Sequence, residues 1–174
     1  MNLYVLRHAS AGVRRVNPKL DVKRPLDKEG KQQCILIANA LNAMRIHFDC
    51  VASSPLKRAL QTASMVSTEI GYEAKILVTE ALAPEATIPA FQQFLSEMAV
   101  HENVLVVGHN PNLQHFLSSL VSQGRANIRL RKGSLARVEL TRRPGTLNWL
   151  VDPRLLRQVY TSVTRRSRRK TSRK

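Results

Sequence analysis

Short apolar runs without polar alternation are the feature of this sequence that most constrains its fold. Residues 3–6 and 104–107 are the clearest examples, and a polar segment follows each run at once. A run of this length is typical of a strand that is covered on both faces, as in a parallel sheet. Apolar residues at helical spacing occupy the segments between the runs. This alternation predicts an α/β protein with three layers, in which helices cover both faces of an open, mostly parallel sheet.

Capping and turn signals predict the other elements of the fold. Asp27 is the expected N-cap of a helix that reaches about residue 45. Ser54 and Asn110 each precede a proline, and both pairs predict the start of a helix. A Pro-Gly pair at residues 144–145 indicates the turn of a terminal antiparallel hairpin. The remaining expected elements are strands over residues 48–52, 74–78, 135–141 and 146–151, and a helix over residues 88–100.

Net charge is the unusual part of the composition. The chain has 28 Lys and Arg against 12 Asp and Glu, which gives +16 at neutral pH. Seven of the positive charges lie within residues 165–174, where there is no acidic residue. Because such a segment repels itself, we expect a single domain over residues 1–152 and a basic, disordered tail over residues 153–174. The tail also suits electrostatic contact with an acidic partner, nucleic acid or a membrane.

Cysteines and apolar segments indicate the compartment. Cys34 and Cys50 are too few for a disulfide framework, and both are expected to be small buried side chains in a reducing environment. No apolar run is long enough for a membrane span or a signal peptide, so the sequence predicts a soluble, cytoplasmic protein. No Asp/Glu cluster or Cys/His spacing suggests a metal, and no cofactor is expected.

The chemically informative side chains follow three of the predicted strands. Arg7 and His8 end the first strand, Arg58 lies just after the second, and His109 follows the run at 104–107. Ligands of open α/β sheets bind outside the carboxyl ends of the strands, so we expect these residues to meet. Two arginines match phosphate oxygens, and two histidines can act as a neutral nucleophile and a protonated donor. The cluster predicts a metal-free site for phosphoryl transfer.

Four segments carry a resemblance to a known family. They are LYVLRHASAG at residues 3–12, VKRPLDKEG at 22–30, VASSPLKRALQTA at 51–63 and VLVVGHNPNL at 104–113. With these segments in this order, the chain resembles the histidine phosphatase superfamily, and in particular its SixA-type phosphohistidine phosphatases. The resemblance covers roughly residues 1–152. It implies a phosphoglycerate-mutase-like fold and a metal-independent phosphatase.

The resemblance also implies a role for each matching residue. His8 is the nucleophile and becomes phosphorylated, and water then hydrolyses this intermediate. Arg7 and Arg58 bind the phosphoryl oxygens, and His109 is a second catalytic histidine that is charged. Arg24 binds substrate from the rim of the site. Asp21, three residues before Arg24, is a candidate to orient its guanidinium group.

The substrate is expected to be a phosphohistidine on a protein, although two alternatives stay open. Ala9 stands where many relatives have glycine. Many relatives also use a dedicated acidic residue as the proton donor, and the candidates for that role here are Glu80 and Glu85. Imidazole has a pKa of about 6.5 and leaves readily once protonated, whereas an alkyl ester needs a stronger acid. One alternative is a phosphatase of small phosphate esters. The other is a basic binding module without catalysis.

Overall fold

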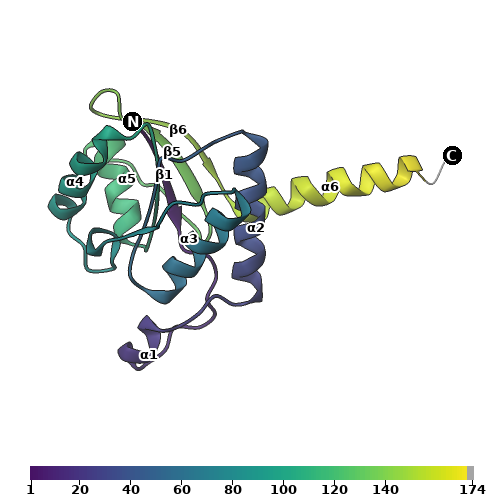
Figure 1. Ribbon diagram of the computed structural model, residues 1–174, viewed down its shortest axis with the longest axis horizontal. Coiled ribbons are helices and arrows are strands. Elements are labelled where there is room, and N and C mark those ends of the chain that lie inside the picture. Colours follow the sequence, from purple (N-terminus) through teal and green to yellow (C-terminus); the bar gives the residue numbers. More distant parts are fainter. Residues whose placement is uncertain (172–174) are drawn as a thin grey trace.

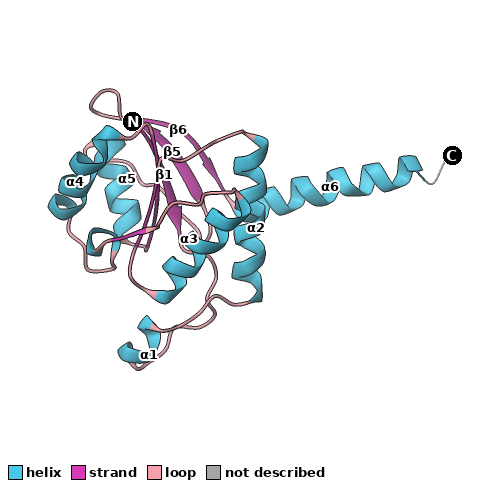
Figure 2. Cartoon of the chain, viewed as in Figure 1, coloured by secondary structure: helices cyan, strands magenta, loops and turns pink. Residues whose placement is uncertain are grey.

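A single mixed sheet forms the centre of the molecule. The computed structural model describes the backbone over residues 1–171 and the side chains over residues 1–162. The strand order is β3-β2-β4-β1-β5-β6, and Figure 2 shows helices on both faces of this sheet. The strands are β1 (Asn2–Arg7), β2 (Cys50–Ser53), β3 (Leu77–Val78), β4 (Asn103–Gly108), β5 (Leu135–Glu139) and β6 (Thr146–Val151).

Strand direction changes at β1, in the middle of the sheet. β1, β4, β2 and β3 pair in parallel, whereas β5 runs antiparallel to β1, and β6 antiparallel to β5. The predicted three-layer α/β fold with a terminal antiparallel hairpin is therefore confirmed. The helices are α1 (Pro18–Val22), α2 (Lys28–Ala43), α3 (Lys57–Glu69), α4 (Ile88–Glu97), α5 (Asn112–Ser122) and α6 (Pro153–Thr171), with 3₁₀ turns at Glu80–Leu82 and Met98–Val100.

The apolar runs are explained by burial on both faces of the sheet. Leu3 and Val5 of β1 point into a core beneath α4 and α5, whereas Tyr4 and Leu6 point into a second core beneath α2 and α3. Figure 1 shows these two helix pairs on opposite sides of β1. Successive strand residues face opposite ways, so a central strand covered twice needs apolar residues at every position.

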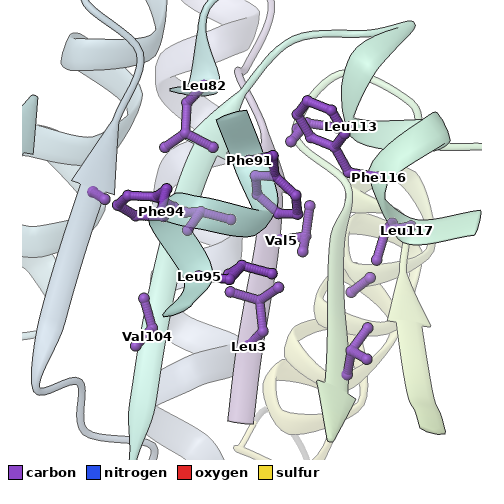
Figure 3. Packing of buried hydrophobic residues seen from close by; sticks show 14 of the residues in the cluster. Leu3, Val5, Leu82, Phe91, Phe94, Leu95, Val104, Leu113, Phe116 and Leu117 are labelled. Atoms are coloured by element: carbon purple, nitrogen blue, oxygen red, sulfur yellow. The ribbon is translucent and has the colours of Figure 1, made fainter. Parts of the chain in front are cut away.

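Aromatic stacking organises the core beneath α4 and α5. Phe91 of α4 and Phe116 of α5 stack with ring centroids 4.1 Å apart and planes 6° from parallel. Figure 3 shows them above Leu3 and Val5 of the central strand. Both rings are less than 3% exposed. Burying rings of this size is a major part of the free energy that holds the helices on the sheet.

Several helix starts differ from the expected ones. Asp27 caps α2 as predicted, because its carboxylate accepts a hydrogen bond from the backbone N–H of Gly30. Ser54 does not cap α3, which begins three residues later at Lys57. The Ser54 hydroxyl instead contacts His109. α5 likewise begins at Asn112, two residues after its expected start, and β3 is shorter than predicted.

The basic C-terminal segment begins as a helix, where the sequence suggested disorder. Asp152 accepts a hydrogen bond from the backbone N–H of Arg154 at the start of α6, and Pro153 occupies the first turn. Leu156 packs on the core beneath α2 and α3, which ties the first turns to the body. A prediction of disorder from charge alone takes no account of this cap or of this apolar contact. The domain boundary at residue 152 stays a prediction, and residues 172–174 lie outside the described part.

Cys34 and Cys50 are both buried, as the sequence predicted, and both are free thiols. Burial raises the pKa of the Cys34 thiol to about 12. Among residues 1–171, no helix has the length and apolar content that a membrane crossing needs.

Candidate active site

The carboxyl ends of β1, β2 and β4 surround a pocket of about 720 Å³. It contains all five residues that the sequence placed in the site, namely Arg7, His8, Arg24, Arg58 and His109. All but Arg7 are less than a tenth exposed. Three distant parts of the sequence reach this edge because parallel strands end there together. The other polar lining residues are Arg14, Arg15, Asp21, Glu85, Asn110 and Lys132.

The sheet holds the backbone of Arg7 and His8 firmly. Arg7 pairs with Gly108 in the parallel ladder, and the backbone N–H of His8 donates to the carbonyl of Gly108 at 3.0 Å. The backbone N–H of Gly133 approaches the carbonyls of Arg7 and His8 from the other side. The Arg7 guanidinium donates through Nη1 to the carbonyl of Leu130 at 2.9 Å. Its Nε is buried and has no hydrogen-bond partner among the described residues.

The His8 ring is held in one tautomer. Its Nδ1 lies 2.8 Å from the backbone carbonyl of Ala9. Since a carbonyl can only accept, Nδ1 carries the hydrogen, and Nε2 keeps its lone pair. The backbone N–H of the same peptide, that of Ser10, donates to Oε1 of Gln33 in α2 at 2.9 Å, which fixes the peptide that orients the ring.

Burial and neighbouring cations keep His8 neutral. Burial lowers the pKa of His8 to about 3, and the positive charges of Arg58, Arg7 and Lys132 act in the same direction, against the hydrogen bond to Ala9. A neutral imidazole with a free lone pair at Nε2 is the form that can attack phosphorus.

His109 lies beside His8, with ring centroids 4.9 Å apart. Its Nε2 is 2.9 Å from the hydroxyl oxygen of Ser54, whereas its Nδ1 is buried without a partner among the described residues. Burial, together with the neighbouring His8, Arg58 and Arg7, lowers the pKa of His109 to about 2. The charged form implied by the resemblance therefore requires a nearby phosphoryl group, whose negative charge would raise the pKa of His109.

Asp21 joins two arginines of the pocket. Its Oδ1 accepts from Nε of Arg24 at 2.8 Å, and its Oδ2 lies 3.4 Å from Nη1 of Arg58. Burial opposes ionisation of Asp21, but hydrogen bonds from the backbone N–H of Arg15 and from Arg24 outweigh it and lower the pKa. The expectation that Asp21 orients Arg24 is confirmed. Arg24 also donates through Nη1 to the carbonyl of Ala11.

The sequence alone did not predict the roles of several residues in or beside the pocket. Lys132 comes just before β5, which is antiparallel to β1, so the start of β5 lies at the same edge as the end of β1. Glu85 lines the pocket, whereas Glu80 is exposed and does not, so the structure favours Glu85 as the acidic candidate. Ser54 was interpreted only as a cap. Within residues 1–162 no three His, Cys, Asp or Glu side chains gather to hold a metal.

Comparisons with known proteins identify the family. A model of the histidine phosphatase superfamily (branch 1) matches residues 3–83. An uncharacterized protein of Picosynechococcus sp. is 31% identical over 139 residues, which cover 78% of this chain and 82% of that protein. The chain belongs to the histidine phosphatase superfamily.

Further similarities point within that family to SixA. The phosphohistidine phosphatase SixA of Escherichia coli is 27% identical over 157 residues, 88% of this chain and 94% of that protein. A solved structure of the protein histidine phosphatase SixA complexed with tungstate has a TM-score of 0.81 and 26% identity, covering 90% of this chain and 99% of that one. A phosphoglycerate mutase from Bacillus anthracis, at 19% identity and a TM-score of 0.64 over 79% and 87% of the two chains, shares the fold. The phosphoglycerate-mutase-like fold is thereby confirmed.

Proposed function

We propose that this protein is a metal-independent phosphatase that removes phosphoryl groups from phosphohistidine on a protein, through a phosphohistidine formed on His8. The observation that carries the proposal is the contact between Nδ1 of His8 and the Ala9 carbonyl. It leaves the lone pair of Nε2 in a pocket lined by Arg7, Arg24 and Arg58. A nucleophile surrounded by fixed cations suits attack on an anionic phosphoryl group.

In the first step, Nε2 of His8 attacks phosphorus. The new P–Nε2 bond forms while the P–N bond of the substrate breaks, and the substrate imidazole leaves after taking up a proton from solvent water. Arg7 and Arg58 each have a buried Nε without a partner among the described residues, and these donors would contact the phosphoryl oxygens. Nδ1 of His109 is unpartnered in the same way and would donate once the phosphoryl charge has raised its pKa.

In the second step, water attacks the phosphorus of phospho-His8. The P–Nε2 bond breaks, its electron pair returns to Nε2, and inorganic phosphate leaves with the oxygen of the water. The same cations stabilise the charge that develops in both transition states. His8 returns to its neutral form, which its low pKa favours.

Two observations support phosphohistidine as the substrate. The similarity to SixA covers most of both chains. The only carboxylates that line the pocket within residues 1–162 are Asp21, which is occupied by Arg24 and Arg58, and Glu85, which is exposed. A substrate whose leaving group protonates near neutral pH depends least on a buried acid.

The position of Glu85 in the pocket lining favours a second candidate function, that of a phosphatase of small phosphate esters. Its carboxyl group lines the pocket and would protonate an ester oxygen as it leaves. For that function, Glu85→Gln lowers kcat for an alkyl phosphate strongly. For the phosphohistidine function, the same variant leaves turnover of a phosphohistidine peptide nearly unchanged.

The main test measures hydrolysis of a phosphohistidine peptide and of p-nitrophenyl phosphate with a chelator present. We expect His8→Ala to lose about 10³-fold or more in kcat, the scale of a lost nucleophile. His115→Ala is the matched control, because His115 is exposed on α5, and it keeps wild-type activity. A chain truncated after Thr161 also stays active. Full activity of His8→Ala, or no hydrolysis of either compound by the wild type, would exclude the proposal and favour a basic binding module.

A further inference from the structure

A second, basic groove of about 470 Å³ opens beside the active-site pocket. The two share Arg7, Asn110 and Lys132, so the groove is continuous with the site. Its wall comes from the segment between α5 and β5 and from the start of α6. The basic side chains along it are Arg7, Arg129, Arg131, Lys132 and Arg154.

Ion pairs leave the groove with an excess of positive charge. Asp152 binds Nη2 of Arg154 at 2.8 Å and Nε of Arg131 at 3.3 Å, which holds both guanidinium groups on the wall. The other acidic residue of the lining is Glu29. Arg129 and Lys132 take part in no ion pair among residues 1–162. They are therefore available to a negatively charged ligand.

The groove wall is attached to the catalytic residues through Leu130. Its side chain is buried, and its backbone carbonyl accepts hydrogen bonds from Nη1 of Arg7 at 2.9 Å and from Nδ2 of Asn110 at 2.8 Å. The neighbouring Arg131 and Ser134 exchange two further hydrogen bonds. These contacts give Arg129 and Lys132 a defined position next to the site of phosphoryl transfer.

We infer that this groove binds carboxylate side chains of the protein substrate, close in the sequence to its phosphohistidine. The inference rests on the proposed function and adds the substrate class that the enzyme prefers. Guanidinium groups match carboxylates with two parallel hydrogen bonds. A small phosphate ester would be held within the pocket, whereas a polypeptide has to leave the pocket over its rim. Acidic residues on that polypeptide would meet the positive charges of Arg129 and Lys132.

The test compares two short phosphohistidine peptides, one with acidic residues and one with alanines beside the phosphohistidine. Arg129→Glu is the variant, because Arg129 is exposed and lies outside the active-site pocket. Arg142→Glu is the matched control, since Arg142 is exposed in the β5–β6 loop at the opposite end of the sheet. We expect Arg129→Glu to raise KM for the acidic peptide about five- to tenfold at low salt, with the effect falling as salt screens the charges.

Three readouts decide the result. The inference holds if Arg129→Glu raises KM for the acidic peptide as expected, while kcat for that peptide, all constants for the alanine peptide and p-nitrophenyl phosphate turnover change less than twofold. Equal effects of Arg129→Glu on both peptides, or of Arg129→Glu and Arg142→Glu on the acidic peptide, overturn it while leaving the proposed function intact. If the wild type hydrolyses p-nitrophenyl phosphate but neither peptide, the proposed function itself fails, and the groove assignment fails with it.

Discussion

Replacing Asp21 with Asn tests whether the active-site arginines depend on one carboxylate. Asn retains one side-chain oxygen, which can still accept from Arg24 and from the backbone N–H of Arg15. Its amide group then faces Nη1 of Arg58, where Asp21 presents a carboxylate oxygen at 3.4 Å. An N–H donor against a guanidinium donor is repulsive, so Arg58 keeps only its contact with the backbone carbonyl of Asp21 at 3.1 Å.

The size of the effect follows from the geometry of this contact. A hydrogen bond to a charged group contributes about 1.5–3 kcal/mol. The contact between Nη1 of Arg58 and the Asp21 carboxylate is long, and the backbone carbonyl of Asp21 accepts from the same Nη1. We therefore expect losing the carboxylate contact to cost about 1–2 kcal/mol. That free energy corresponds to a loss of roughly 5- to 30-fold in kcat/KM. We expect the loss mainly in kcat, because Arg58 is proposed to stabilise charge that develops during phosphoryl transfer.

The assay is steady-state hydrolysis of p-nitrophenyl phosphate, together with urea unfolding of each variant. Asp49→Asn is the matched control. Asp49 also accepts two hydrogen bonds, from the backbone N–H groups of Glu102 and Asn103, but it precedes β2 at the end of the sheet away from the pocket. Asp49→Asn removes the same charge. We expect it to lower the unfolding free energy and to leave kcat unchanged.

One outcome would refute the reasoning directly. Removing a negative charge makes the pocket more positive, and on electrostatic grounds alone this strengthens the binding of an anion. If Asp21→Asn lowers KM and leaves kcat unchanged, Asp21 only weakens the field of the arginines and does not position Arg58.

Two further predictions concern stability. An added Cβ at Gly30 would lie 2.0 Å from the backbone oxygen of Ser10. We therefore expect Gly30→Ala to lower the unfolding free energy, measured by urea titration, by about 1–3 kcal/mol, despite the better helix propensity of alanine. Equal or greater stability of the variant would contradict this. His8 and His109 have pKa values of about 3 and about 2 in the folded state, against about 6.5 when unfolded. Below pH 6.5 the unfolded chain therefore takes up protons that the folded protein does not. The free energy of unfolding is highest above pH 6.5 and falls as the pH is lowered toward 3. In urea titrations near pH 5, His8→Gln should reduce this slope by about 1.4 kcal/mol per pH unit, one proton's worth, and an unchanged slope would show that His8 is protonated in the folded protein.

The sequence was most informative where one local signal determined one structural outcome. The run at residues 3–6 has apolar side chains at every position because both faces of β1 are covered. Arg7, His8 and His109 could be placed in one site because each lies at the end of a strand or directly after it. Arg58 could be placed because the helix that carries it starts just beyond β2.

Local sequence signals do not predict contacts between distant segments. The hydroxyl of Ser54 could cap a helix or bind His109, and only the packing of β2 against β4 decides between them. Lys132 joins the site because β5 runs antiparallel to β1, and strand direction is not encoded in the residues beside Lys132. Leu156, near the start of α6, packs on the core beneath α2 and α3, a contact that charge composition does not reveal.

Placing the guanidinium groups of Arg58, which is buried, and Arg7, which is partly buried, in this site costs free energy. Burial lowers the pKa of Arg7 and of Arg58, which means that the folded protein holds these cations less favourably than water does. Part of their hydrogen-bonding capacity is unmet among the described residues. An anion at this edge relieves both penalties, so inorganic phosphate, the product of the reaction, stabilises the fold and competes with the next substrate at the same time. Selection for turnover and selection for stability therefore act in opposite directions on the same two side chains.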